Sequence, residues 1–349
     1  MEVKEWQSCG VPARQGSAMC YLDGLMFLFG GRAAKVKREY LSDFWVGSEA
    51  NRTWQEVQQS NDTELWPCKR HNHGMVPCTS RKSIFLYGGA THGEIIREKP
   101  SIRYKPKYLD DLWEYNIVSR TWTNHNIPGP SGKNALTLSA ARGGAFLFGG
   151  FGEEFLDDLW FISIPHSPEL PYWKRISCST GPSARAYHAG VVDSNSSLYI
   201  AGGYEWNSQE RREVYFSDFW RFDIAQSQWE RLQDFPLARN RCTLAACPDE
   251  HIVLINGNYF DYSTHEDVFL RQYEVFCKGE WNSVQRDITP SALFPAVSHM
   301  ASCSCDNTIW LFGGEKHTIR YNATYEVKRK RILQLCGRLE VSIFFGVLR

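Results

Sequence analysis

The chain of 349 residues lacks an excess of charge of either sign. It has 39 basic and 39 acidic side chains, so no overall positive field would draw it to nucleic acid. It also lacks an apolar run of about 18 residues, and we therefore expect no membrane span. The N-terminus opens on charged residues without the apolar core of a secretion signal, which predicts a cytoplasmic location, with the nucleus as the alternative.

Sequence patterns typical of catalysis and metal binding are lacking too. There is no GxSxG, no HExxH and no GxxxxGK[ST]. The 11 cysteines show no CxxC spacing, and the close pair Cys303 and Cys305 has no second pair that would complete a zinc site. We therefore expect free thiols, no catalytic residue, no metal ion and no cofactor.

The chain does contain six copies of one pattern, an apolar strand that ends in a glycine doublet. The copies are FLFGG, FLYGG, FLFGG, LYIAGG, the degenerate IVLINGN and WLFGG. Their doublets stand 58, 61, 53, 54 and 57 residues apart, which indicates a repeat array. The positions are Gly31, Gly89, Gly150, Gly203, Gly257 and Gly314.

A second pattern keeps the same period: an acidic-aromatic segment followed by a spaced tryptophan. The segments LSDFW, LDDLW, LDDLW and FSDFW precede Trp54, Trp122, Trp173 and Trp229. In the fifth copy we assign Asp267 and Phe269 to this pattern, with Trp281 as its tryptophan. We interpret the aspartates before the tryptophans as turn or backbone-bonding residues and not as catalytic acids.

These two patterns in register resemble the Kelch repeat over nearly the whole chain. The resemblance implies an all-β fold, a six-bladed Kelch β-propeller with one four-stranded blade for each repeat. The residues agree with it, because runs such as SIFLY lack polar alternation and predict strands buried on both faces. The doublets supply positive φ angles, and the tryptophans fill the wedge between blades.

The N-terminal segment EVKEW is predicted to close the ring. The sixth copy lacks a spaced tryptophan, and Trp6 stands where an outer strand could complete that blade. Such closure removes open sheet edges. We therefore expect one propeller over residues 1–327 and a C-terminal tail of uncertain structure at 328–349, in which 332–336 partly resemble a short elongin-docking helix.

The residues that we predict to bind a partner are mostly basic and lie in two kinds of loop. The resemblance to Kelch propellers implies that the loops that lead into each blade share one face with the loops that follow the doublets. Arginine and aromatic residues dominate binding hot spots, and arginine grips a carboxylate with two parallel bonds. The alternative is that each repeated arginine braces its own loop. The predicted residues are Arg14, Arg32, Arg38, Arg70, Arg103, Arg185, Tyr204, Trp206, Arg211, Arg212 and Arg239.

The resemblance favours a non-enzymatic module for protein–protein interaction. We expect a protein or peptide partner, acidic or ending in a carboxylate, and neither nucleic acid nor membrane. Many Kelch proteins are substrate receptors of ubiquitin ligases, so the resemblance implies a role for this chain as such a receptor or as a scaffold. The alternative is an enzyme that uses a metal ion or small molecule in the central pocket. His73, His188 and His299 each begin an inner strand, and we interpret them as structural.

Overall fold

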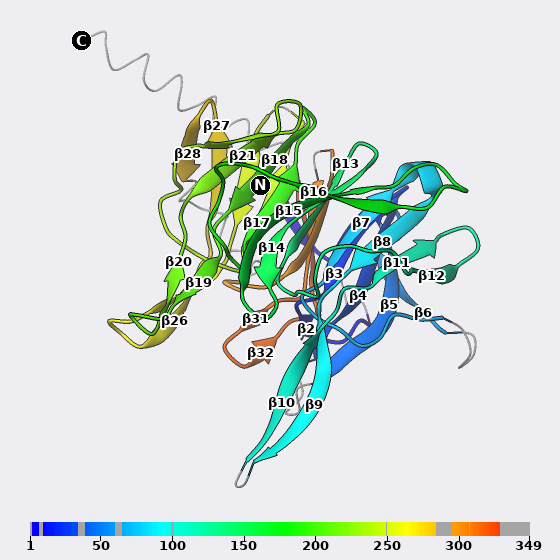
Figure 1. Cartoon of the computed structure of the whole chain (residues 1–349), viewed down its shortest axis with the longest axis horizontal. Helices are drawn as coiled ribbons and strands as arrows, with labels where there is room; N and C mark the ends of the chain where they lie inside the picture. Colours follow the sequence, from blue (N-terminus) through cyan, green and yellow to red (C-terminus); the bar gives the residue numbers. More distant parts are fainter. Residues whose placement is uncertain are drawn as a thin grey trace.

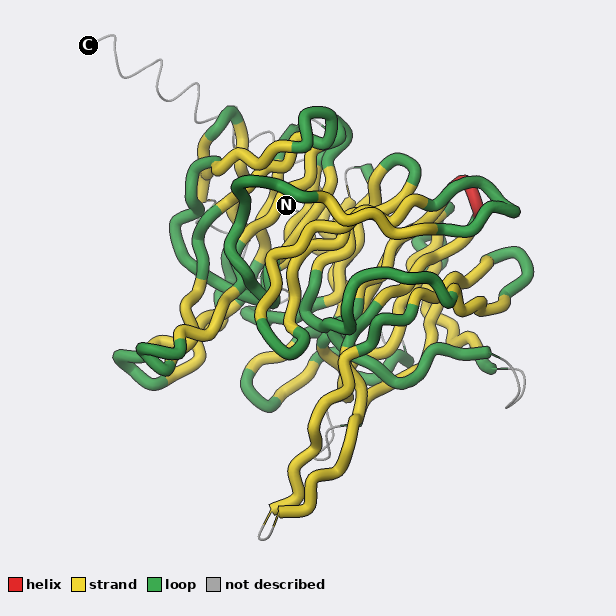
Figure 2. Tube along the Cα trace, viewed as in Figure 1, coloured by secondary structure: helices red, strands yellow, loops and turns green. Residues whose placement is uncertain are grey.

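The structure is a computed structural model that describes residues 2–6, 10–33, 39–59, 65–98, 101–248, 250–283, 295–306 and 308–328. It is built of strands, and the described residues include one short 3₁₀ helix, η1 (Thr79–Arg81). Within these residues no helix is long and apolar enough to cross a bilayer. Six antiparallel sheets stand around a common axis as the blades of a propeller (Figures 1 and 2).

Each blade takes its inner three strands from one repeat. Blade one contains β3 (Ala18–Leu22), β4 (Leu25–Ala33), β5 (Tyr40–Ser48) and β6 (Thr53–Val57), with the short β2 (Arg14–Gln15) beside β4. Blade two contains β7 (Gly74–Cys78), β8 (Ser83–Tyr87), β11 (Leu112–Asn116) and β12 (Thr121–His125). Blade three contains β13 (Thr137–Ala141), β14 (Gly144–Phe151), β15 (Phe155–Ser163) and β16 (Tyr172–Ile176).

The remaining blades repeat this plan. Blade four contains β17 (Ala189–Val192), β18 (Ser197–Ala201), β21 (Phe219–Asp223) and β22 (Gln228–Arg231). Blade five contains β23 (Thr243–Ala246), β24 (Ile252–Ile255), β27 (Tyr273–Cys277) and β28 (Glu280–Ser283). Blade six contains β29 (Ala301–Cys305), β30 (Thr308–Phe312) and β33 (Thr324–Lys328), completed by β1 (Glu2–Glu5).

Four hairpins follow the glycine doublets and project from one side of the ring, which we call the loop face (Figure 1). The longest, in blade two, we call the arm. They are the arm, β9 (Ala90–Glu98) with β10 (Ser101–Tyr108); β19 (Tyr204–Asn207) with β20 (Arg212–Tyr215); β25 (Asn258–Asp261) with β26 (Glu266–Phe269); and β31 (Glu315–Lys316) with β32 (Ile319–Arg320).

The N-terminal strand closes the ring, as the sequence predicts. Strand β1 pairs antiparallel with β33, and the backbone N–H of Trp6 donates to Thr324 O at 3.0 Å. The position of Trp6 differs from the prediction. In blade six Val3 lies opposite Val327, and in blade one Trp54 lies opposite the equivalent residue, Gly47. Val3 therefore holds the position of the repeat tryptophan, and Trp6 lies after the strand. The domain boundary at residue 327 stays a prediction, and 329–349 lie outside the described residues.

The glycine doublets join each blade to the next. The second glycine of each doublet has φ between 92° and 106°, and in five blades its N–H donates to a carbonyl oxygen of the following blade at 2.8–3.0 Å. A Cβ on Gly31 would come within 2.8 Å of Gln15 O, so a side chain has no room there. In blade five Asn256 replaces the first glycine at φ 54°, a conformation that asparagine tolerates.

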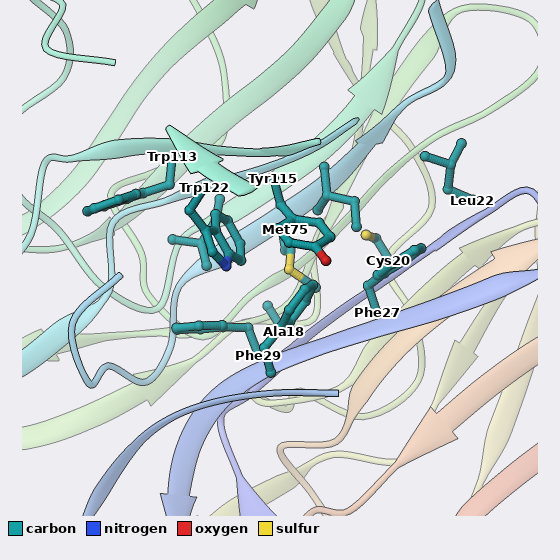
Figure 3. Close-up of a cluster of buried hydrophobic side chains, with 12 residues drawn as sticks. Ala18, Cys20, Leu22, Phe27, Phe29, Met75, Trp113, Tyr115 and Trp122 are labelled. Atoms are coloured by element: carbon teal, nitrogen blue, oxygen red, sulfur yellow. The ribbon is translucent and has the colours of Figure 1, made fainter. Parts of the chain in front are cut away.

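The core lies between blades, where large side chains of neighbouring sheets interdigitate. Figure 3 shows the cluster between blades one and two, in which Phe29 and Trp122 meet edge to face with ring centroids 5.7 Å apart. The other spaced tryptophans likewise contact the preceding blade, for example Trp229 against Phe148 at 5.6 Å. The repeat tryptophans thus fill the wedge between blades, as expected.

A buried ionic cluster ties blade two to the insert of blade three. Arg81 donates to both carboxylate oxygens of Glu114 at 2.9 and 3.1 Å, and to Glu169 O at 2.8 Å. The ring of His125 lies 2.8 Å from Glu114 Oε2. Burial by itself would raise the pKa of Glu114, but the hydrogen bonds from His125, Arg81 and Ser83 lower it from 4.5 to about 2.

This shift predicts how stability depends on pH. Because the pKa of Glu114 is depressed in the folded state, its contribution is complete above pH 4.5 and is lost as the pH falls through about 2. A Glu114→Gln variant should be about 2 kcal/mol less stable at neutral pH. The difference from wild type should shrink as the pH falls towards 2, measured by urea unfolding. A difference that stays constant with pH would show that the charge of Glu114 is irrelevant.

Candidate functional site

The four arginines of the loops that lead into the blades are buried. Arg14, Arg70, Arg185 and Arg239 have no exposed side-chain surface. The guanidinium group of Arg185 donates to Asp218 Oδ1 and Oδ2 at 2.6 and 2.7 Å, and to Gly202 O at 3.1 Å. We expected these four arginines to contact a partner at the surface, and that expectation is wrong. A carboxylate and backbone carbonyls surround each guanidinium group, so each arginine braces its own loop, which is the alternative that the sequence left open.

The aspartates of the acidic-aromatic segments are the partners of these cations. Arg14 pairs with Asp43, Arg70 with Asp111, and Lys133 takes the cationic place opposite Asp158. In all four intact segments the indole N–H of the tryptophan two residues later also donates to the aspartate, at 2.6–2.7 Å. The aspartate therefore joins a buried cation to a tryptophan indole, an arrangement that we call the ionic clip, and is not the turn or backbone-bonding residue that the sequence suggested.

The pKa shifts of the aspartates agree with this ionic clip. Burial by itself would raise the pKa of Asp218, but the hydrogen bonds and charge of Arg185, with the indole of Trp220, hold that pKa below its usual value. Asp111 shows the same direction through Arg70 and Trp113. Asp111 and Asp218 are consequently ionised and paired with Arg70 and Arg185 inside the propeller.

Blades five and six lack the arginine–aspartate–tryptophan arrangement of the ionic clip. In blade five Arg239 pairs with Glu274 at 2.9 Å, and Glu274 occupies the place that tryptophan has in the intact segments. The assignment of Asp267 and Phe269 to this pattern is therefore wrong, since both lie on β26 of the hairpin. In blade six the cation and the carboxylate are both replaced, by Val297 and Ala323.

The remaining predicted residues lie on different blades of the loop face. Trp206, Arg211 and Arg212 are exposed on the hairpin β19–β20, where the Arg212 guanidinium lies 5.7 Å from the ring centroid of Tyr262. Arg32 is half-buried at the end of β4. Arg103 belongs to β10 of the arm, and Arg38 lies outside the described residues. Their predicted contact with a partner stays a prediction.

One residue from each blade surrounds the propeller axis in a left-handed backbone conformation. Each N–H donates to the carbonyl oxygen of the preceding member at 2.7–3.4 Å, and the last carbonyl accepts from the first N–H. We call this closed ring the axial belt. Its members, with φ between 50° and 62°, are Gly16, Asn72, Ala135, Tyr187, Arg241 and His299.

The axial belt opens onto the loop face through a charged and aromatic mouth. The Arg241 guanidinium lies 4.7 Å above the ring of Tyr187, which stacks on Tyr204 with centroids 5.7 Å apart. Glu315 lies 3.6 Å from Arg241 and 3.5 Å from Arg320, so two guanidinium groups share one carboxylate. A further carboxylate, Glu213 on β20, contacts the hydroxyl of Tyr215.

The belt encloses a cavity of about 210 Å³ whose lining includes polar atoms without partners. Within the described residues, Asn72 Oδ1, Ser17 Oγ and Arg241 Nε are buried and make no hydrogen bond. A Cβ on Gly16 would lie 2.4 Å from Asn72 Oδ1, so glycine keeps this part of the cavity open. Buried polar atoms in native proteins are normally satisfied, and these indicate a site that water or a ligand completes.

The histidines divide into two kinds. His73 and His188 pack edge-on against Phe29 and Phe148, and burial together with the nearby Arg185 lowers the pKa of His188 to about 3, which agrees with a structural role. His299 instead belongs to the axial belt, one position earlier in the repeat, and its Nδ1 lies 2.7 Å from Gln15 Oε1. Grouping it with the other two was therefore wrong. Across the described ranges no cluster of three potential metal ligands occurs.

The axial-belt residues Tyr187, Arg241 and His299 are not among the partner-binding residues that the sequence predicts. A signal for two of them was present, because each stands two residues after a repeated arginine, in RAY and RNR. In blade six Val297 stands in place of the arginine, so this signal is absent before His299.

Comparison with known proteins matches residues 16–257 to the KLHDC2/KLHL20/DRC7 Kelch-repeats domain. The chain belongs to the Kelch-repeat family. Kelch propellers generally mediate protein–protein interactions. Among individual relatives, an F-box/kelch-repeat protein of Arabidopsis thaliana is 22% identical over 73% of this Kelch chain and 53% of its own length. Human Kelch domain-containing protein 10 is 21% identical over 62% of this chain and 46% of its own length. The chain thus spans about half the length of the curated relatives it matches.

Proposed function

We propose that this Kelch propeller is a non-enzymatic interaction module that seats the acidic or carboxylate-terminated end of a partner peptide in the axial mouth. The observation that carries the proposal is the Arg241 guanidinium, held over Tyr187 at the opening of the cavity with its Nε unpartnered among the described residues. A guanidinium group can donate two parallel hydrogen bonds to a carboxylate.

The other groups of the mouth suit the end of a peptide. Asn72 Nδ2 donates to the hydroxyl oxygen of Tyr187 at 3.0 Å, which leaves the Tyr187 proton available to a ligand. Asn72 Oδ1 and Ser17 Oγ can accept from a backbone amide of the ligand. The guanidinium groups of the mouth already bind one carboxylate of the chain itself, because Glu315 lies between Arg241 and Arg320.

The test is affinity capture followed by mass spectrometry, with the full chain as bait. Arg241→Met keeps the apolar stem over Tyr187 and removes the charge, and should reduce the captured partner at least about tenfold because a desolvated charge pair is lost. Arg142→Met, at the exposed turn between β13 and β14, is the matched control and should change nothing. Equal capture by both folded variants would refute the role of the mouth.

We propose further that the captured protein is presented to a ubiquitin ligase or a scaffold. Support comes from the Arabidopsis relative, whose name combines an F-box with kelch repeats. Ligase subunits should then co-purify with the bait, and the partner should accumulate when the proteasome is inhibited. Absence of both effects would leave capture alone as the function.

A further inference from the structure

A second cavity on the loop face, which we call the arm cleft, lies between the arm and the tip of blade three. This tip is the turn that joins β14 to β15. Its volume is about 920 Å³, and more of its lining is apolar than polar. Tyr108 and Pro106 of β10 contribute one side, and Phe151 and Leu156 of blade three contribute the other.

The part of the arm cleft lined by Gly132 and Gly152 is formed by close backbone contacts. A Cβ on Gly132 would lie 2.5 Å from Tyr108 O, and one on Gly152 would lie 2.8 Å from Gly132 O. The ring of Phe151 meets that of Tyr108 edge to face at 5.7 Å. Two glycines and an aromatic contact therefore hold the base of the arm against blade three.

The two walls of the cleft carry opposite charge. Lys105 and Lys107 are exposed on the arm, whereas Glu153 and Glu154 are exposed at the tip of blade three. Glu94 of β9 is also exposed and lines the arm side of the cleft, so this wall carries two positive charges and one negative charge. Among the described residues none of these five makes a salt bridge, so their charges are available to an occupant.

A continuous series of aromatic rings connects the arm cleft with the axial mouth. Neighbouring rings lie 4.9–5.7 Å apart, and each ring is only partly buried. Four such contacts extend over at most about 22 Å, which corresponds to about six residues of extended chain. The series runs through Tyr108, Phe151, Phe155, Tyr204 and Tyr187.

We propose that the arm cleft is a second subsite for the same partner, occupied by the segment about six residues before the end that the mouth holds. This inference rests on the proposed function. The occupant is an extended peptide segment whose apolar side chain packs against the apolar residues that line the cleft. A basic side chain of this segment faces Glu153 and Glu154, and an acidic one faces Lys105 and Lys107. Pro106 has no N–H, so the edge of β10 cannot continue a hydrogen-bond ladder at that residue, and recognition is through side chains.

The experiment is selection from a random peptide library displayed with free C-termini, using the full chain. Wild type should enrich peptides with a basic residue about six positions before the terminal carboxylate. A Glu153→Lys, Glu154→Lys double variant should enrich an acidic residue at that position and keep the terminal preference. Synthetic peptides of the two kinds should differ about tenfold in affinity, in opposite order for the two proteins, because like charges replace opposite ones.

The outcomes separate this inference from the proposed function. A terminal preference with the same upstream composition for both proteins would overturn the arm cleft and leave the mouth standing. An upstream charge switch without terminal preference would support the cleft and overturn the mouth. No enrichment by the wild type would overturn both. Both glutamates are exposed, so equal melting temperatures verify that the variant is folded.

Discussion

Replacing Asp218 by alanine should destabilise the folded protein by about 3–5 kcal/mol, because it leaves a buried cation without its partner. Arg185 has no exposed side-chain surface and two short bonds to this carboxylate. The change would also remove the acceptor of the Trp220 indole N–H. Urea unfolding at neutral pH measures the loss.

The chain supplies a matched rescue and a matched control. Blade six carries Val297 and Ala323 where blade four has Arg185 and Asp218, so an Arg185→Val, Asp218→Ala double variant copies a natural solution. It should regain about 2 kcal/mol or more of the loss, since no charge is then left buried. Asp234→Ala breaks the exposed pair with Arg231 and should change stability by about 1 kcal/mol or less. A double variant less stable than Asp218→Ala would refute this account.

Replacing Trp6 by alanine should destabilise the protein by about 3–5 kcal/mol, because the indole is 3% exposed and lies where the ring closes. Its ring centroid is 6.3 Å from that of Trp54, and both belong to the core between blades six and one. The resulting cavity would weaken the contact between the first and last segments of the chain.

Trp206→Ala is the control for this prediction. Trp206 is 52% exposed on β19, so the same substitution there should change the unfolding free energy by about 0.5 kcal/mol or less. Thermal and urea unfolding of the two variants give the comparison. Equal stability of the two variants would mean that β1 and Trp6 do not hold the ring closed.

Much of the fold follows from spacing in the sequence. Two patterns in register, the doublets and the spaced tryptophans, predict six repeats, and the resemblance to the Kelch repeat implies that each repeat is a blade. The missing tryptophan of the sixth repeat predicts closure by the N-terminal segment. Local requirements explain this success. A doublet such as Gly30–Gly31 needs two positive φ angles, and a middle strand such as β8 is apolar because both of its faces are buried.

The candidate site follows from the sequence much less well. A basic residue such as Arg185 looks the same in a sequence whether it faces a partner or a buried carboxylate, and its partner Asp218 is 33 residues away. Arg241, Tyr187 and His299 meet because a belt of backbone hydrogen bonds brings different blades to one axis. No local pattern reports that distance, since the residues are separated by whole repeats.

The sequence by itself therefore determined the number of blades, the strands within them and the way the ring closes. These depend on residue type and period along the chain. Only the tertiary structure decided which charges are internal braces, which polar groups line the axial cavity, and which hairpins lie side by side on the loop face. Those properties depend on distances through space, which closure of the ring sets for all six blades at once.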